Sequence, residues 1–167
     1  AIISATPGGC DVNAKIHEFV SHHIGIPQFL LEKPTYDNNS RRGREIYVRN
    51  FRRLIKDLEE FTGEKLKTEN LRQVAEKANQ ASQIYDDIWE LRKQIPSPVP
   101  GSSALLAYGM RFSMWGRDGA IESLEKILEV STRNSKDEDY NSQEEVARLL
   151  WVYLPFYYDN FQYAEWL

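Results

Sequence analysis

The sequence predicts a helix-rich α/β protein in which a partial βαβ unit precedes a long helical region and the start of a second α/β lobe. Three observations support this fold class. Two short apolar runs flank a helix-like repeat near the beginning, apolar residues then recur at helical spacing, and a further apolar run follows near the end. We therefore expect four segments: the end of a first lobe at 1–35, a helical region at 36–133, a polar linker at 134–146 and the start of a second lobe at 147–167.

The first lobe contains the βαβ pattern. Residues 1–5 are an apolar run typical of a buried strand, and 11–23 place Ile16, Phe19 and Val20 on one face of a helix. Gly25 is expected to end this helix, and 26–31 is the second strand candidate. Such a unit is the repeating element of Rossmann-like sheets, which bind ligands at the carboxyl ends of their strands.

The only cysteine of the chain, Cys10, lies between the first strand and the expected helix. Unpaired N–H groups and the positive dipole end at a helix start favour the thiolate, which is the form that attacks or binds metal. Pro7, Gly8 and Gly9 form a bend that lets the backbone approach a ligand. A small, partly buried thiol without chemistry is the alternative, and this pattern alone leaves both open.

Two long helices and two shorter ones are predicted in the middle of the chain. The first ends at Gly63, and the second begins at the cap candidate Thr68 and continues to Ile95. A proline-rich turn ends the second helix, because proline lacks the N–H that a helix interior needs. The shorter helices are expected at 103–113 and, after Asp118, at 119–133.

The end of the chain predicts the second lobe. Residues 134–145 are polar and charged, 147–154 read as a buried strand that Pro155 ends, and 158–167 begin another helix. The aromatic residues concentrated there are expected to be core. The chain starts in an apolar run and stops in mid-pattern, so we expect it to be part of a longer protein.

Composition excludes several classes. With 21 basic and 25 acidic residues the formal charge is −4, which gives no electrostatic case for a nucleic-acid partner. A single cysteine excludes an internal disulfide. The sequence shows no secretion signal and no apolar run of the about 20 residues that span a membrane. We therefore expect a soluble protein of the cytoplasm.

Several short motifs occur in a fixed order along nearly the whole chain. Together they make the chain resemble the 2-hydroxyacyl-CoA dehydratase and benzoyl-CoA reductase family. In particular, the chain is similar to a central fragment of a subunit like the 2-hydroxyglutaryl-CoA dehydratase D-component. The motifs are Cys10-Asp11 after a strand, Gly25-Ile26-Pro27, Leu31-Glu32-Lys33-Pro34, the helix end at 60–66, the helix at 71–79, Glu90-Leu91-Arg92 before prolines, and Arg148-Leu149-Leu150-Trp151.

The resemblance implies an oxygen-sensitive iron-sulfur enzyme built from two homologous subunits, each with two α/β lobes joined by helices. Cys10 matches the cysteine that ligates a [4Fe-4S] cluster in this family, and the other ligands would lie before residue 1 and beyond residue 167. The resemblance identifies no catalytic residue here.

The chemistry that the resemblance implies is a radical reduction. A separate ATP-hydrolysing iron-sulfur activator delivers an electron, the thioester carbonyl of an acyl-CoA substrate accepts it, and loss of the hydroxyl group as water gives an enoyl-CoA. The reductase branch of the family reduces an aromatic ring instead. Two alternatives remain open: a helical interaction subunit without a cluster, and a thiol redox switch at Cys10.

Two further groups of residues allow two interpretations each. The arginine cluster Arg41, Arg42, Arg44, Arg49, Arg52 and Arg53 either holds CoA phosphates or docks a negatively charged partner, or it is a solvated helix face balanced by Glu45, Asp57, Glu59 and Glu60. On sequence alone we favour the solvated face. His17, His22 and His23 lack neighbouring carboxylates or thiols, so structural or solvated roles are expected for them.

Overall fold

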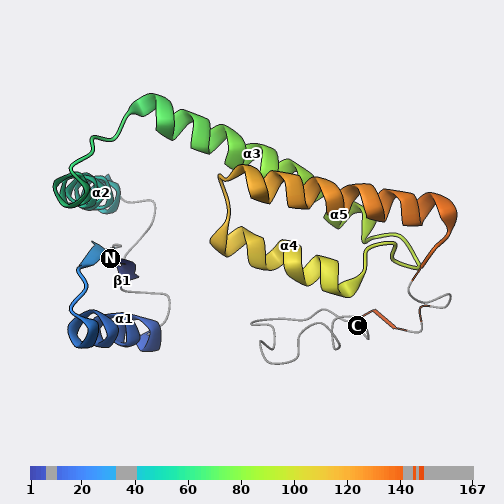
Figure 1. The fold of residues 1–167 in the computed structure, drawn as a ribbon, viewed down its shortest axis with the longest axis horizontal. Helices are drawn as coiled ribbons and strands as arrows, with labels where there is room; N and C mark the ends of the chain where they lie inside the picture. Colours follow the sequence, from blue (N-terminus) through green and yellow to red (C-terminus); the bar gives the residue numbers. More distant parts are fainter. Residues whose placement is uncertain (7–10, 33–40, 141–144, 146, 149–167) are drawn as a thin grey trace. The chain divides into compact units, whose positions relative to one another are not determined.

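The computed structural model describes residues 1–6, 11–32, 41–140, 145, 147 and 148. The chain divides into two compact units, Ala1–Lys67 and Thr68–Leu167. Figure 1 shows the strands in the first unit and helices α3 (Thr68–Leu91), α4 (Gly101–Ser113) and α5 (Asp118–Asp137) in the second. The described residues therefore form the helix-rich α/β protein that the sequence predicts.

Unit 1 contains a parallel two-stranded sheet. Strand β1 (Ile2–Thr6) pairs with β2 (Gln28–Glu32), and the register runs from Ile2 opposite Gln28 to Thr6 opposite Glu32. Helix α1 (Asp11–Ile24) connects the strands and packs on both. Helix α2 (Arg41–Thr62) packs on β2, and Figure 1 shows the strands between α1 and α2. The predicted βαβ unit is confirmed.

Two glycines end the helices of unit 1. Gly25 follows α1 with a φ of 75°, and its N–H donates to the carbonyl of Ser21 at 2.9 Å. Gly63 follows α2 with a φ of 73°, and its N–H donates to the carbonyl of Glu59 at 3.0 Å. Both residues adopt the left-handed conformation that glycine tolerates best, so the sequence located both helix ends correctly.

Unit 2 consists of packed helices. Helix α3 (Thr68–Leu91) packs against α5 (Asp118–Asp137), which also contacts α4 (Gly101–Ser113). Their facing sides bury one apolar cluster, which closes around Ile88 and Leu124, both fully buried. The other members of this cluster are Ala81, Ile84, Tyr85, Val99, Ala104, Ala107, Met110, Ile121 and Ile127.

The two predicted helix ends in unit 2 are wrong by four residues each. Helix α3 ends at Leu91 instead of Ile95, which is 75% exposed, because three prolines follow within 96–100 and disfavour helix around them. Helix α5 instead continues to Asp137, into the segment expected as polar linker.

Tertiary hydrogen bonds explain the longer α5. Asn134 Nδ2 donates to the carbonyl of Pro98 at 3.2 Å, and Ser135 Oγ donates to Gln94 Oε1 at 2.6 Å. Both bonds tie the last turn of α5 to the connection that follows α3. Local propensity did not predict them, since their partners lie about 40 residues earlier in the chain.

The predicted second lobe falls largely outside the described residues. Of the strand expected at 147–154 the structure describes Ala147 and Arg148, and neither is in a strand. The helix expected at 158–167 lies outside the described part of the chain. The four-segment division of the chain stays a prediction.

In the described ranges, no helix combines the length and the apolar character needed to cross a membrane.

Candidate functional site

The predicted cluster ligand, Cys10, lies outside the described residues, but the elements on both sides of it are placed. Strand β1 ends at Thr6, and α1 begins at Asp11, the residue directly after Cys10. The thiol therefore belongs to the short connection between the carboxyl end of a parallel strand and the start of a 14-residue helix. This is the position at which α/β sheets bind ligands.

A buried hydrogen-bond network holds the elements that flank this connection. Ser4 Oγ on β1 is 3.0 Å from His17 Nδ1 on α1 and accepts a hydrogen bond from Gln28 Nε2 on β2, also at 3.0 Å. Ser4 is buried, and its hydroxyl bonds both neighbours at once. This arrangement holds the His17 ring against the sheet and gives it a structural role.

The other two histidines are on the exposed side of α1. His22 and His23 lie in the last turn, and His23 stacks on Phe19 with ring centroids 5.5 Å apart.

Among the described residues no group of three or more His, Cys, Asp or Glu side chains is placed to hold a metal ion. The sequence analysis did not identify Ser4 or Gln28, although a serine inside an apolar strand is a signal that merits attention.

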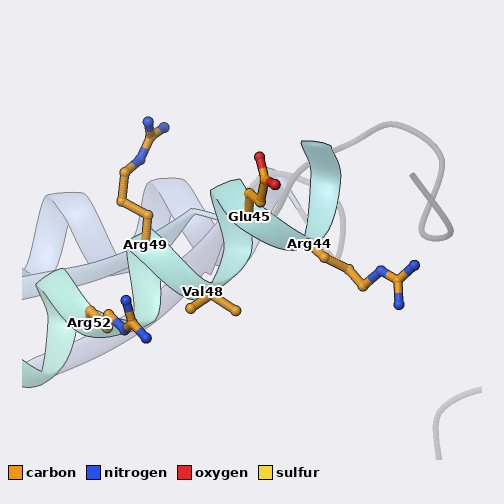
Figure 2. A pocket seen from close by; sticks show the side chains of 5 residues that line it. All are labelled: Arg44, Glu45, Val48, Arg49 and Arg52. Atoms are coloured by element: carbon orange, nitrogen blue, oxygen red, sulfur yellow. The ribbon is translucent and has the colours of Figure 1, made fainter. Parts of the chain in front are cut away.

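The predicted arginine cluster lies on the first half of α2 and divides into paired and unpaired residues. Arg41 Nε bonds Glu45 Oε1 at 2.9 Å, and Arg53 bonds Glu32 at 3.3 Å. The other four, Arg42, Arg44, Arg49 and Arg52, form no ion pair with any residue that the structure describes. Three of these, Arg44, Arg49 and Arg52, line an open hollow of about 370 Å³ together with Glu45 and Val48 (Figure 2).

The acidic residues of α2 do not balance these arginines as expected. Glu59 pairs with Lys65 at 2.9 Å and Glu60 pairs with Lys56 at 3.6 Å, both away from the arginines. Only Glu45 pairs within the cluster, and its partner is Arg41. The arginine side of α2 is solvated, as the favoured interpretation requires, but its charge is largely uncompensated within the described residues.

Unit 2 contains a stack of aromatic and guanidinium groups that the sequence analysis missed. Tyr85 stacks on Trp89 with centroids 4.4 Å apart, Arg111 lies over Tyr85 at 5.4 Å, and Arg92 lies over Trp89 at 5.3 Å. Burial raises the pKa of Tyr85, and burial together with the charge of Arg148 lowers the pKa of Arg92. The stack packs against the core of unit 2, so we assign it a structural role.

Arg148 bonds the backbone just after helix α3, although it lies 56 residues beyond Arg92 in the sequence. Its guanidinium donates to the carbonyl of Arg92 at 2.8 Å and to that of Gln94 at 2.7 Å, and it pairs with Glu145. The hydrogen bond and the charge of Arg148 lower the pKa of Glu145. Arg148 belongs to the Arg-Leu-Leu-Trp motif and Arg92 to the Glu-Leu-Arg motif, so the structure brings two of the motifs together.

The described fold defines a class: an α/β protein whose parallel βαβ unit carries a lone thiol before its helix and is followed by a helical unit. A family model described as 2-hydroxyglutaryl-CoA dehydratase, D-component, matches residues 1–167. The chain belongs to this family and is a 2-hydroxyacyl-CoA dehydratase-type subunit. The resemblance found in the sequence motifs is thereby confirmed. No curated protein matches the chain at a significant level.

Proposed function

We propose that this chain is part of a subunit of an iron-sulfur enzyme that catalyses the ATP-activated, reductive dehydration of a 2-hydroxyacyl-CoA to an enoyl-CoA. The observation that carries the proposal is the family match, which covers all 167 residues. The sequence position of the only cysteine supports it, because Cys10 falls between the end of β1 and the start of α1, and α/β sheets bind ligands at the carboxyl ends of their strands.

This chain fits a [4Fe-4S] cluster as the source of one of its ligands. Such clusters are held mainly by cysteine thiolates, and Cys10 is the single cysteine present. The start of α1 directly after Cys10 favours the thiolate form that a cluster requires. The remaining ligands must then come from residues outside these 167. When bound, the cluster supplies one-electron transfer at a potential tuned by its surroundings.

The chain's own residues hold this ligand position in place. The Ser4 hydroxyl links β1 to His17 of α1 and to Gln28 of β2, so both elements that bracket Cys10 are fixed to the same sheet. A side chain at an element boundary is positioned more accurately when both flanking elements are held. We infer that Ser4, His17 and Gln28 are positioning residues for the Cys10 segment.

The proposed reaction needs three partners: a homologous second subunit, an ATP-hydrolysing iron-sulfur activator and the acyl-CoA substrate. A thioester carbonyl accepts an electron only at very low potential, which explains the coupling to ATP hydrolysis. We propose that the complex works in the reducing cytoplasm, where a lone thiol stays reduced.

The full-length protein, purified without oxygen, tests the reaction. We expect it to convert a 2-hydroxyacyl-CoA to the enoyl-CoA when its second subunit, the activator and ATP are present, and to lose this activity when ATP is omitted. Cys10→Ser, which keeps the size of the side chain but weakens its binding to iron, should reduce turnover to background. Ser113→Ala is the control for a single-atom change at an exposed position and should retain full turnover.

Two results would contradict the proposal in different ways. Full turnover by Cys10→Ser would remove the cysteine from the mechanism. Reduction of an aromatic acyl-CoA ring by the wild type, without dehydration, would place the protein in the reductase branch of the family.

A further inference from the structure

The exposed side of α2 presents three guanidinium groups along one shallow groove. Figure 2 shows two rows of side chains, Glu45 with Arg49 in one, and Arg44, Val48 and Arg52 in the other. At 3.6 residues per turn, this side lies opposite the face on which Gly43, Asn50 and Leu54 are buried. We call Arg44, Arg49 and Arg52 with Val48 between them the arginine groove.

The charge of the arginine groove is costly for the helix that carries it. Positions 41–53 hold six arginines and one acidic residue, whereas the whole chain has a formal charge of −4. Cations in the first turn of a helix, here Arg41, Arg42 and Arg44, oppose its dipole, and like charges three or four residues apart repel each other. The first turn of α2 has no acidic residue to offset this. This charge is largely uncompensated among the residues that the structure describes, which favours a ligand that supplies the missing negative charge.

The chemistry of the groove suits an oxyanion such as phosphate. All six basic residues at 41–53 are arginines, whose planar guanidinium groups bind phosphate oxygens in pairs, while a lysine acts as a point charge. Arg44 and Arg52 are separated by about 12 Å along the helix axis, at 1.5 Å per residue. This spacing suits a ligand that carries two separate phosphate groups. Val48 offers an apolar contact between them, since its side chain is exposed.

We infer that the arginine groove binds the diphosphate and the 3′-phosphate of the coenzyme A moiety of the substrate. The inference rests on the proposed function, which makes the substrate a CoA ester. It assigns Arg44, Arg49 and Arg52 to substrate binding, and it assigns Arg41 and Arg53 to ion pairs within unit 1.

Calorimetric titration of the full-length protein with free coenzyme A tests the inference. The groove variant carries Arg44→Gln, Arg49→Gln and Arg52→Gln. The matched control carries Lys126→Gln, Arg133→Gln and Lys136→Gln, which remove the same charge from exposed positions of α5. We expect the Kd to rise about tenfold or more in the groove variant, because hydrogen bonds to charged groups are lost, and to stay unchanged in the control.

A second titrant identifies the phosphate that is bound. Dephospho-coenzyme A lacks the 3′-phosphate, so the wild type should bind it more weakly than coenzyme A, and the difference should shrink in the groove variant. Raising the ionic strength should weaken binding to the wild type more than to the groove variant, because exposed charges are screened by salt.

The outcomes separate this inference from the proposed function. Equal affinity of the wild type, the groove variant and the control overturns the inference and leaves the proposed function standing, and so does equal loss in both variants. A groove variant that keeps its affinity for coenzyme A but no longer binds the second subunit or the activator overturns it in favour of an acidic protein partner. A protein that binds coenzyme A through the groove but holds no iron supports the inference and contradicts the proposed redox chemistry.

Discussion

The two units bury their apolar side chains to very different extents. In unit 2 three helices enclose a common core, with Ile88 and Leu124 fully buried. In the described part of unit 1, Leu54 is the one buried apolar side chain, while Phe19 on α1 is 66% exposed. Other exposed apolar residues of unit 1 include Ile3, Val12, Ile16 and Ile24. Two strands with one helix on each side offer little shared interior, whereas packed helices enclose one.

This difference separates stability from function. The core that stabilises the described structure is in unit 2, and the residues to which we assign ligands, Cys10 and the arginine groove, belong to unit 1. Substitutions in unit 2 should therefore change the free energy of unfolding, and substitutions in the sites of unit 1 should mainly change binding.

The largest expected effect is in the core of unit 2. Leu124→Ala removes a fully buried side chain, so we expect it to lower the free energy of unfolding by about 2–5 kcal/mol. Phe19→Ala, its counterpart in unit 1, should cost less than about 1 kcal/mol because the ring is largely in solvent. Urea denaturation followed by circular dichroism measures both. Equal losses would show that the apolar face of α1 is as well covered as the core of unit 2.

Two glycines, one in each unit, test the comparison with a loss of stability of intermediate size. Gly116 has a φ of 83°, and a Cβ there would lie 2.8 Å from Val74 Cγ1, so Gly116→Ala combines backbone strain with a clash. Gly25 has a φ of 75° and open space around it. We expect Gly25→Ala to cost about 1–2 kcal/mol from the left-handed backbone alone, and Gly116→Ala to cost more.

Val74→Ala provides the control for the clash. Added to Gly116→Ala, it should recover part of the lost stability in thermal unfolding. If the two substitutions are simply additive, the approach of Val74 is not what constrains Gly116.

The next comparison is between two buried polar residues, one in each unit. Asn50 is buried in unit 1, and its Nδ2 donates to the carbonyl of Glu32 at 2.9 Å. Asn50→Ala should therefore lower the free energy of unfolding by about 1–3 kcal/mol, because it leaves that carbonyl without its donor.

Ser131 is buried in unit 2, and its hydroxyl has no hydrogen-bond partner in the described structure. Ser131→Ala should be neutral or stabilising, and a clear loss of stability in denaturant unfolding would reveal a partner for this hydroxyl.

The smallest effect expected is a pH dependence at the end of α2. Glu59 accepts hydrogen bonds from Lys65 Nζ at 2.9 Å and from the N–H of Leu66 at 2.8 Å, and these bonds lower its pKa. A carboxyl whose pKa is lower in the folded state stabilises the fold above its unfolded pKa of about 4.3 and loses that contribution as the pH falls through the folded pKa.

The Leu66 amide reports this change locally. We expect its protection from hydrogen exchange to decrease in acid below the unfolded pKa of Glu59, and Glu59→Gln to weaken the protection already at neutral pH. Protection that does not change with pH in the wild type would mean that the carboxylate does not hold the segment after α2.

The sequence predicted the elements well where the signal is local. Apolar spacing located all five described helices, and Gly25 and Gly63 marked two of their ends because a left-handed residue is needed there. The error at Asp137 has a non-local cause, because the bonds from Asn134 and Ser135 reach residues that lie about 40 positions earlier in the chain. The error at Ile95 is local, because the prolines that follow it also disfavour helix in the residues before them.

The candidate site was predictable to a smaller extent. The position of Cys10 before a helix followed from the local pattern, and the family resemblance followed from the order of the motifs. The bond between Ser4 and His17 requires the packing of α1 on β1, which the sequence pattern does not show. The pairing of Glu45 with Arg41, which leaves Arg42, Arg44, Arg49 and Arg52 without an ion pair in the described structure, also became visible only with side chains in place.

Iron and acid-labile sulfide in the full-length protein test the central claim most directly. We predict about four of each per subunit in wild-type protein purified without oxygen, and their loss in Cys10→Ala with the circular dichroism spectrum nearly unchanged. Unchanged iron in Cys10→Ala would contradict the assignment of Cys10 as a cluster ligand. A well-folded wild type without iron would contradict the iron-sulfur enzyme and favour an interaction subunit that holds no cluster.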